Sequence, residues 1–258
     1  MQNKKNILIS NDDGISADGI KYLYETLKLD YNVFVVAPHT EKSASSLSTT
    51  IKNPLHIHKL KWDDNENIYQ ITGTPADCIK MSLSVLFDTK FDLIVSGINK
   101  GTNSGRNLLY SGTLGCVIEG AMRGFLGIAF SCHEFMNPNY KKILKYIPKI
   151  IDFFLENKPD EGTIINVNFP SKDKEIKGFK LARQGQSRWL EKPDKRLHPE
   201  GYDYYWLGVH WKDYKEEANS EIEHLKEGYI TATPVHVNEL TDHKYLNLKK
   251  DEFENSFF

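Results

Sequence analysis

Cysteine is scarce in this sequence, and no two cysteines stand in a metal-binding spacing. The 258 residues contain only Cys78, Cys116 and Cys132. An odd number without a CxxC motif argues against a disulfide framework and against a structural zinc site. The chain also lacks an uninterrupted apolar stretch long enough to span a bilayer, and its amino-terminal MQNKKN runs into a short apolar strand instead of a signal-peptide core. We therefore expect a cytoplasmic protein that does not bind membranes.

An excess of charge of either sign is missing as well. The 33 basic and 35 acidic residues give a formal net charge of -2, which argues against nucleic-acid polymers and membrane surfaces as partners. Hydrophobic residues make up 40% of the chain and charged residues 26%, close to the values of globular proteins. A chain of this length can form one α/β domain with a smaller extension.

Three well-known site signatures are absent too. The sequence has neither the GxxxxGK[ST] pattern of a P-loop nor the GxGxxG pattern of dinucleotide-binding folds, and it has no GxSxG elbow for a Ser-His-Asp hydrolase. His56 and His58 share one strand face in LHIHKL. A metal pair is conceivable there, but a half-buried strand is the favoured interpretation. A site must therefore be sought among other residues.

Apolar strands alternate with helical patterns over the first 170 residues. The sequence predicts buried strands at 6–10, 32–38, 91–98, 126–132 and 162–170, and helices at 17–29, 112–125 and 140–157. Pro148 is expected to kink or divide the last helix. This order is typical of an α/β protein with a Rossmann-like, doubly wound and mainly parallel sheet.

The character of the sequence changes after about residue 170, and we place the domain boundary near residue 185. We expect a catalytic core over 1–185 and a carboxyl-terminal extension over 186–258. In the extension, YDYYWLGVHW at 202–211 resembles a strand of a β-hairpin, and YITATPVHV at 229–237 is predicted to return to the core as a strand. The charged tail carries three phenylalanines, at positions 253, 257 and 258.

Polar side chains follow three of the predicted strands. NDDG follows the first strand, TEKSASSLSTT follows the second, and NKGTNSGRN follows the strand at 91–98. Six of the eight residues from 43 to 50 are Ser or Thr. Ligands of open α/β sheets bind beyond the carboxyl ends of the strands, so the sequence predicts one site at this edge.

Asp12 and Asp13 require a physical explanation, because adjacent residues in a strand point to opposite faces. Both carboxylates can meet one ion only if the chain leaves strand geometry, which Gly14 permits. Two close carboxylates repel each other unless a proton or a cation compensates, and a hard cation such as Mg²⁺ or Mn²⁺ prefers oxygen ligands. The alternative is a plain Asp-Gly turn in which Asp13 caps the following helix.

Two further segments are candidates for binding phosphate. GTNSG has glycines at both ends, Gly101 and Gly105, so its backbone amides can cradle an anion. SGT at 111–113 precedes a predicted helix, whose amino terminus favours anions, although simple capping by Ser111 and Thr113 is an alternative. Positive charge in these loops can come from Lys42, Lys100 and Arg106.

Several blocks of the sequence, in the same order along the chain, resemble one known family. They are ILISNDDGISADGI, VVAPHTEKSASS, ITGTPADC, VSGINKGTNSG and YSGTLGCVIEGAMRG, with a weaker echo in TATPVHV. They cover most of residues 7–124 and are similar to the SurE-type nucleotidases, or stationary-phase survival proteins, which are metal-dependent phosphatases of nucleoside monophosphates.

The resemblance implies a function, a metal site and an assembly. The implied metal ligands are Asp12, Asp13, Ser43 and Asn99, with Mg²⁺ or Mn²⁺ as the cofactor. Where the family often has Arg-Ser-Gly-Ala-Ser, this chain reads Lys42-Ser43-Ala44-Ser45-Ser46, so the cation is kept and the glycine is lost. The family fold is Rossmann-like with an extension used in dimer or tetramer assembly, for which 202–211 and the tail are the candidates here.

The sequence therefore predicts a 5′-nucleotidase that releases phosphate from nucleoside monophosphates, with 3′-nucleotides and polyphosphate as further family substrates. A water molecule at the cation would attack, and Asp12 or Asp13 would orient it or accept its proton. The substrate-binding candidates are Asn11, Lys42, Gly101, Asn103, Ser104, Gly105, Ser111, Gly112 and Thr113.

Two alternatives stay open at this point. A haloacid-dehalogenase-type phosphatase would form an aspartyl-phosphate, but that chemistry usually needs aspartates at i and i+2, whereas here they are adjacent. A non-catalytic nucleotide-binding module is compatible with the same fold.

Overall fold

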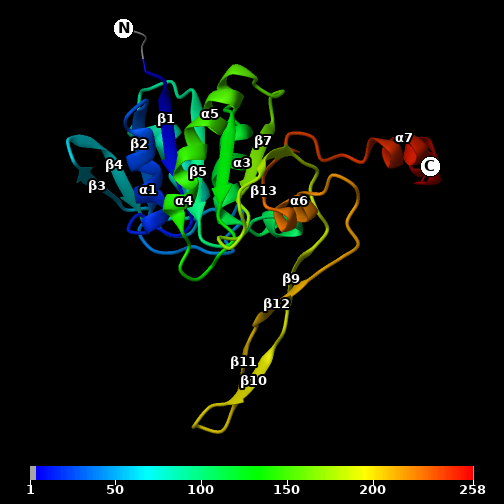
Figure 1. Ribbon diagram of the computed structural model, residues 1–258. Coiled ribbons are helices and arrows are strands. Elements are labelled where there is room, and N and C mark those ends of the chain that lie inside the picture. Colours follow the sequence, from blue (N-terminus) through cyan, green and yellow to red (C-terminus); the bar gives the residue numbers. More distant parts are fainter. Residues whose placement is uncertain (1–3, 258) are drawn as a thin grey trace.

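The strands of the body, including one from the carboxyl-terminal region, form one sheet that is covered by helices on both faces (Figure 1). The computed structural model describes residues 4–257. Within them the sheet has nine strands in the order β3-β4-β2-β1-β5-β6-β7-β13-β8. The strands are β1 (Asn6–Ser10), β2 (Asn32–Pro38), β3 (Ile57–Trp62), β4 (Asn65–Ile71), β5 (Leu93–Asn99), β6 (Gly127–Ser131), β7 (Thr163–Asn168), β8 (Gly178–Leu181) and β13 (Tyr229–His236).

The sheet is mainly parallel, which confirms the predicted fold class. Strand β3 is antiparallel to β4 and β13 is antiparallel to β7, whereas the other neighbouring strands pair in parallel. The helices are α1 (Asp18–Leu27), α2 (Pro75–Met81), α3 (Gly112–Ala121), α4 (Tyr140–Ile143), α5 (Ile147–Glu156), α6 (Glu221–Glu227) and α7 (His243–Glu254).

Alternate residues of the central strands pack on opposite faces, as the pleat of a strand requires. Ile7 and Ile9 belong to the hydrophobic cluster that α1 and α5 cover. Leu8, between them, belongs to the cluster that α2 and α3 cover. All three side chains are fully buried, which explains why the strand reads as an unbroken apolar run.

The strand order reverses between β1 and β5. From β1 the chain proceeds through α1 to β2 on one side, and β5 pairs with the other side of β1 before α3 leads on to β6. Such a switch point leaves a crevice beyond the carboxyl ends of the two strands, where open α/β sheets bind ligands. Asp12 and Asp13 follow β1, and Lys100 follows β5.

The helix predicted at 140–157 is divided, as the proline indicated. Residues Tyr140–Ile143 form α4, a 3₁₀ turn spans Leu144–Tyr146, and Pro148 stands in the first turn of α5, where its missing amide proton costs nothing. The sequence interpretation missed the strands β4 and β8 and the helices α2, α6 and α7. Strand β8 has four residues and helices α2 and α6 have seven each, β4 is partly exposed, and α7 buries none of its residues, so none of them shows a long apolar period.

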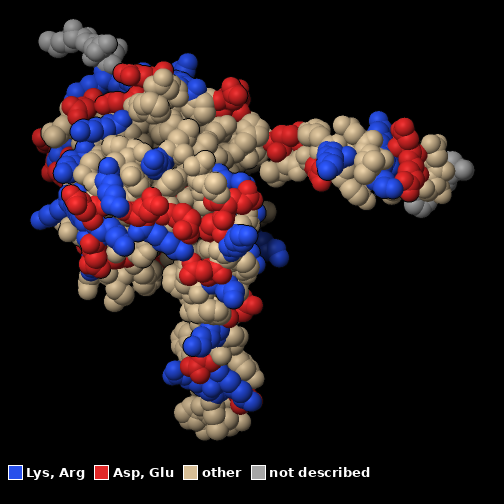
Figure 2. Space-filling model, turned by 45° about the vertical axis from the view of Figure 1, so that its right-hand side comes forward, with Lys and Arg blue, Asp and Glu red and all other residues tan. Residues whose placement is uncertain are grey.

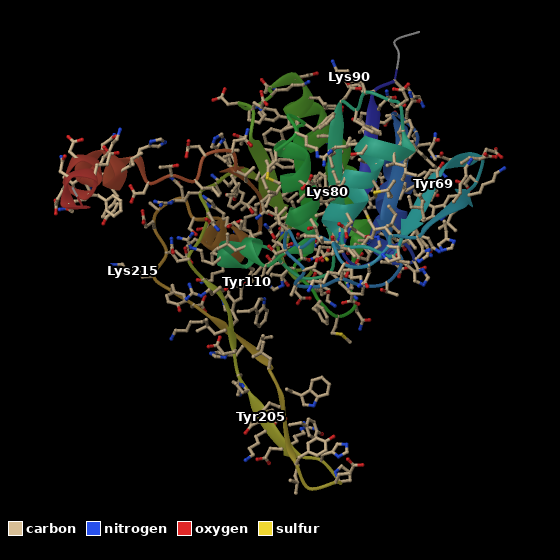
Figure 3. The ribbon with its side chains drawn as sticks, turned by 180° about the vertical axis from the view of Figure 1, so that it is seen from behind. Tyr69, Lys80, Lys90, Tyr110, Tyr205 and Lys215 are labelled. Carbon is tan, nitrogen blue, oxygen red and sulfur yellow. The ribbon has the colours of Figure 1, made fainter. Side chains whose placement is uncertain are left out.

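The aromatic stretch at 202–211 is part of a long hairpin that projects from the body (Figures 1 and 3). Its strands are β9 (Arg188–Glu191), β10 (Asp194–Leu197), β11 (Asp203–Trp206) and β12 (Val209–Lys212). Strand β10 pairs with β11, and β9 pairs with β12. Tyr205 and Trp206 are both 62% exposed, and Figure 3 shows Tyr205 far from the sheet.

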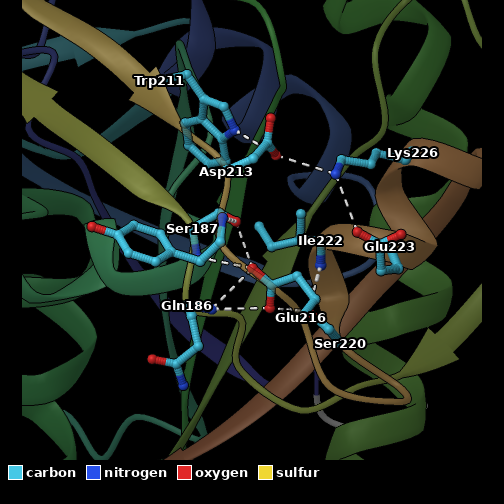
Figure 4. Close-up of polar contacts among 10 residues, drawn as sticks. Gln186, Ser187, Trp211, Asp213, Glu216, Ser220, Ile222, Glu223 and Lys226 are labelled. Atoms are coloured by element: carbon cyan, nitrogen blue, oxygen red, sulfur yellow. Dashed lines mark hydrogen bonds and ion pairs between the residues drawn. The ribbon is translucent and has the colours of Figure 1, made fainter.

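One carboxylate fastens the base of this hairpin to the body. Glu216 accepts hydrogen bonds from the amides of Gln186 and Ser187, from Ser187 Oγ and from Ser220 Oγ, at 2.6–3.1 Å (Figure 4). These donors hold the pKa of Glu216 below its usual range, against the opposing effect of burial. The division of the chain at residue 185 stays a prediction, while β13 lies between β7 and β8 in the central sheet.

The surface carries mixed charges. On the face in Figure 2, Lys and Arg alternate with Asp and Glu over the body and along the hairpin. His56 and His58 are exposed at the edge of the sheet, and His58 lies in β3 with half-buried Ile57 and Leu60, which confirms the strand interpretation. Across residues 4–257, no helix has the length and apolar character needed to cross a membrane.

Candidate active site

The segment Asn11–Gly14 leaves strand geometry directly after β1. Gly14 has φ +95°, a left-handed conformation that glycine adopts without steric penalty, and Asn11 Nδ2 donates to Gly14 O at 3.0 Å. The expected turn is therefore confirmed. The capping alternative for Asp13 is not, because α1 has Ala17 as its N-cap and no side chain caps it.

Asp12 lies against the amino terminus of α3. Its Oδ1 accepts a hydrogen bond from Thr113 Oγ1 at 2.6 Å, and the side chain is buried. A Cβ at Gly112 would lie 2.7 Å from Asp12 Cβ and 2.6 Å from Ser45 Oγ, so only glycine allows this approach. Burial raises the pKa of Asp12 to about 6, the Thr113 hydrogen bond opposes the rise, and the neighbouring Asp13 adds to it.

Asp13 faces the loop that follows β5. Its Oδ2 accepts the backbone amide of Lys100 at 3.2 Å, and Lys100 Nζ lies 3.5 Å from Oδ1. The same ammonium lies 3.1 Å from Glu41 Oε2, and Ser43 Oγ donates to Glu41 Oε1 at 2.6 Å. Burial raises the pKa of Asp13, and its contacts with Lys100 oppose the rise. Of the three expected cations, Lys100 lies at Asp13, whereas Arg106 donates to Gln184 and Gln186.

The hydroxyl-rich loop after β2 brings two serines towards the aspartates. The backbone amide of Lys42 donates to Asp12 O at 2.7 Å, which fixes the start of the loop. Ser43 is exposed, whereas Ser45 Oγ is buried beside Asp12 and Gly112. Ala44 stands at φ 57°, a conformation that glycine tolerates far better than alanine, at the position where the family often has glycine.

The ITGTPADC block anchors the far end of that loop. Thr74 and Asp77 form a capping box at the start of α2. Asp77 also accepts the amide of Thr50, and Thr74 Oγ1 donates to Ser48 O at 2.6 Å. Between this end and the Lys42 amide, which is bonded to Asp12 O before Ser45, Ser46 donates from its amide to Tyr110 O and from Oγ to Leu109 O. The loop is therefore held on both sides of Ser45.

Asn99 ends β5 and begins the glycine-flanked loop. Its Nδ2 donates to Gly101 O at 2.7 Å, which leaves the carbonyl oxygen Oδ1 as its acceptor end. Ser111 caps α3 by accepting the Leu114 amide at 3.2 Å, as the capping interpretation predicted. Gly112 and Thr113 occupy the first two helical positions, whose amides have no acceptor in their own helix.

The amide cradle expected at Gly101–Gly105 is occupied by the protein itself. The amide of Gly101 donates to Glu134 O, that of Asn103 to Asn168 Oδ1, that of Ser104 to Thr102 Oγ1, and that of Gly105 to Glu221 Oε1. The Asn103 side chain donates to Ser131 Oγ at 2.8 Å in the interior. These bonds fix the loop in place and leave the amino terminus of α3 as the better anion site.

Two supports of this loop were missed from the sequence. Asn168 on β7 accepts from both Thr102 Oγ1 and the Asn103 amide at 2.9 Å. Glu221 at the start of α6 is fully buried, and it accepts the amides of Gly105 and Gly185 and the hydroxyl of Thr233. Only the polar side chain of Asn168 in a buried strand could have drawn attention beforehand, because such side chains need partners.

The donor set at Asp12 and Asp13 fits a hard divalent cation. Among the described residues, Asn11 Oδ1 and Ser45 Oγ are buried side-chain oxygens without a hydrogen-bond partner. Ser45 Oγ lies close to Asp12 across Gly112, Asn11 precedes Asp12 in the chain, and burial raises the pKa of both Asp12 and Asp13. A cation would favour the ionised carboxylates and would accept neutral oxygens as ligands. No group of three His, Cys, Asp or Glu side chains suited to a metal occurs within residues 4–257.

Fold and site together define an α/β protein with an oxygen-rich acidic site at the switch point of a doubly wound sheet. A family profile described as "Survival protein SurE" matches residues 7–191. The "5′-nucleotidase SurE" of Protochlamydia amoebophila is 45% identical over 257 residues, covering 98% of both chains. That of Thermosipho africanus is 39% identical, covering 96% of this chain and 98% of its own.

A solved structure is also similar. The crystal structure of the SurE protein from Aquifex aeolicus superimposes with a TM-score of 0.81 at 35% sequence identity, and the match covers 96% of this chain and 99% of that chain. This chain belongs to the SurE family.

Proposed function

We propose that this chain is a 5′-nucleotidase, a phosphoric monoester hydrolase that releases phosphate from nucleoside monophosphates. The observation that carries the proposal is the pair of adjacent carboxylates at the switch point, with Asp12 bonded to the amino terminus of α3 and Asp13 paired with Lys100. The curated name of the relatives supports the same activity. A cation-dependent phosphatase needs these two parts, one for the metal and one for the phosphoryl group.

The proposed cofactor is Mg²⁺ or Mn²⁺, held by Asp12, Asp13, Ser43 and Asn99, with Asn11 Oδ1 and Ser45 Oγ as adjacent oxygens. When bound, the cation neutralises charge that builds on the phosphoryl oxygens. Ser43 donates to Glu41 in this structure, whereas Ser45 Oγ is buried without a partner among the described residues. Ser45 is therefore a second candidate for the serine ligand.

The chain's own groups would hold the phosphate and move the proton. The amides of Gly112 and Thr113 and the Ser111 hydroxyl offer donors at the positive end of α3, and Lys100 Nζ supplies a positive charge beside Asp13. Asp13 borders an open cavity, whereas the Asp12 carboxylate accepts from Thr113 and does not line that cavity. We assign to Asp13 the orientation of the attacking water and the acceptance of its proton.

The test is phosphate release from AMP and GMP with Mg²⁺ or Mn²⁺, with and without a chelator. We expect turnover with either cation and its loss in the chelator. The variant Asp13→Asn should lose at least about 10³-fold in kcat while remaining folded, whereas the exposed Asp88→Asn should match the wild type. Near-normal turnover of Asp13→Asn with added cation would refute the assignment. Phosphate transferred to Asp12 would favour the aspartyl-phosphate alternative.

Substrate range is a finer part of the proposal. Activity on 3′-nucleotides and on polyphosphate is proposed from the family resemblance. The same phosphate assay applied to 3′-AMP and to tripolyphosphate tests it directly. Release from 5′-AMP alone would restrict the enzyme to 5′-monophosphates.

We also propose that the chain forms a homodimer or homotetramer through the projecting hairpin and tail. Trp206 on the hairpin is 62% exposed, Val209 is 61% exposed and Leu248 on α7 is 69% exposed, and both segments extend away from the body (Figure 1). Exposed apolar side chains on such segments favour burial against another copy. Light scattering should give a multiple of the 29.7 kDa mass, and Trp206→Asp should reduce it.

We propose a cytoplasmic location because of the state of the three cysteines. All three thiols are free and buried, and burial raises the pKa of Cys78, Cys116 and Cys132, which keeps them as unreactive thiols. Free thiols persist in reducing compartments. Fractionation of cells that express the tagged chain tests this proposal.

A further inference from the structure

A cavity of about 570 Å³ opens directly beside Asp13. Its lining includes Asp13, Lys100, Tyr22, Phe135, Asn137 and Asn139. The volume lies within the range of small-molecule sites, roughly 300–1,000 Å³. Asp13 forms part of the cavity wall. When the phosphoryl group of a substrate binds at the aspartates, the rest of that substrate therefore points into or past this cavity.

The aromatic ring of Phe135 borders this cavity, and most of its surface is exposed. Phe135 is 60% exposed. Lys100 Nζ lies 5.6 Å from the centre of its ring and 3.5 Å from Asp13 Oδ1, so the ring and the carboxylate flank the same ammonium. The ring also lies over Gly101, where an added Cβ would be 3.7 Å from Phe135 Cδ2.

The segment that carries Phe135 is anchored, so the cavity wall is formed in advance. The carbonyl of Glu134 accepts the Gly101 amide at 2.9 Å, and its Oε1 accepts the Lys172 amide at 2.5 Å. Lys172 Nζ donates to Asn137 O at 3.3 Å. The residues on both sides of Phe135 are thus tied to the loop after β5 and to the loop after β7.

Amide side chains line the same cavity as this ring. Asn137 and Asn139 are exposed at the cavity, and Asn139, the N-cap of α4, makes no capping hydrogen bond with its side chain. An amide both donates and accepts hydrogen bonds. An exposed aromatic face beside amide groups is the combination by which proteins bind an unpaired nucleobase, through stacking and through its polar edge.

We infer that this cavity is the subsite for the nucleoside of the substrate, with the base stacked on Phe135 and its edge bonded by Asn137 or Asn139. The inference rests on the proposed function and adds a specificity determinant to it. A free phosphate or a polyphosphate has no group that would occupy this subsite. Phe135 therefore distinguishes nucleotides from other phosphate esters.

The test compares kinetics on a substrate with a base and on one without. Phe135→Ala should raise KM for AMP by about 5- to 150-fold, the range for loss of one base stacked on an aromatic ring, and should leave kcat/KM for ribose 5-phosphate within about twofold. Phe135→Tyr should retain most of the affinity for AMP. Phe153→Ala is the matched control, since Phe153 is 56% exposed on α5 outside the cavity.

A binding experiment with adenosine tests the subsite independently of phosphate hydrolysis. Calorimetry should detect adenosine binding to the wild type and to Phe153→Ala, and a loss of at least fivefold in affinity for Phe135→Ala. If the wild type bound adenosine and Phe135→Ala lost that binding, while the wild type hydrolysed no mononucleotide, the subsite would be supported and the proposed function refuted. Equal KM changes on AMP and ribose 5-phosphate, or adenosine binding that Phe135→Ala leaves intact, would overturn the subsite.

Discussion

Asp12 and Glu221 are two buried acids in this region: Asp12 follows β1 and contacts the start of α3, whereas Glu221 begins α6 and bonds the Gly105 loop. Burial raises the pKa of Asp12 to about 6 and that of Glu221 to about 7. Their hydrogen bonding differs. Thr113 Oγ1 is the one side-chain donor to Asp12 among the described residues, whereas Glu221 accepts two amides and a hydroxyl. Asp12 therefore has carboxylate oxygen lone pairs left for a ligand, whereas the carboxylate of Glu221 is used to hold the Gly105 loop.

The comparison shows why a raised pKa alone does not identify a catalytic acid. Both values have the same main cause, desolvation by burial. What separates the two acids is their neighbours: Asp12 adjoins Asp13 and lies close to Ser45 Oγ, a buried oxygen without a partner among the described residues, while Glu221 accepts from three donors. Four predictions test this separation, beginning with the largest effect.

Asp12→Asn should reduce phosphate release from AMP by about 10³-fold or more, because the site loses one of its two negative charges. The Asn Oδ1 can still accept from Thr113, so the variant should fold. Its free energy of unfolding in a chelator should equal or exceed that of the wild type, since a buried charge is removed. Urea unfolding and steady-state kinetics check both outcomes. A marked loss of stability would show that Asp12 is a structural acid like Glu221.

Glu221→Ala should lower the free energy of unfolding by about 2–4 kcal/mol, because it leaves the Gly105 and Gly185 amides and the Thr233 hydroxyl without an acceptor. Glu221→Gln keeps an acceptor oxygen and should lose about 1 kcal/mol or less. Urea denaturation measures both variants. If the two variants were equally stable, the hydrogen bonds to Glu221 would not be the reason for its burial.

The Glu221 carboxyl should also make stability depend on pH. Its pKa is raised in the folded protein from an ordinary 4.5 to about 7, so its contribution to stability is fully present below about pH 4.5 and is lost as pH rises through 7. The stability of the wild type relative to Glu221→Gln should therefore fall by about 2 kcal/mol between pH 5 and 8. Unfolding curves of the two proteins at both pH values measure this difference. A constant difference would contradict the raised pKa.

Ser45→Ala should weaken the apparent affinity for Mn²⁺ or Mg²⁺ by up to about tenfold, because it removes a buried oxygen beside Asp12. Ser48→Ala, at an exposed position of the same loop, is the control and should match the wild type. Titration of activity with the cation measures the shift. A larger effect of Ser43→Ala than of Ser45→Ala would favour the serine that the family resemblance implies.

Much of the fold was predictable because its signals are local. The apolar runs at β1, β2 and β5 and the helical period of α1 and α3 occur within single elements, so the doubly wound sheet followed from their order. The strands β4 and β8 were missed because they are partly exposed and are defined by their partners in the sheet. Helix α6 was missed because it has only seven residues, too few to show a helical period.

The candidate site was predictable to the level of loops, not of atoms. The sequence indicated that NDDG, the hydroxyl-rich loop and the GTNSG loop meet at one edge, because parallel strands end together. It could not indicate that the amides of GTNSG are bonded to Asn168 and Glu221, which lie 65 and 116 residues away in the chain. It also could not show which of Ser43 and Ser45 is the better candidate for the serine ligand of the cation.

By itself the sequence determined the turn at Asp12-Asp13-Gly14, because Gly14 alone permits the backbone there, and it determined the order of strands and helices that leads to a doubly wound sheet. Only the tertiary structure decided which neighbours each acid has. Thr113 approaches Asp12, Lys100 approaches Asp13, and Phe135 borders the cavity beside them. The reason is physical: hydrogen bonds and burial between residues distant in the chain depend on how the loops pack in space, and no local pattern in the sequence records them.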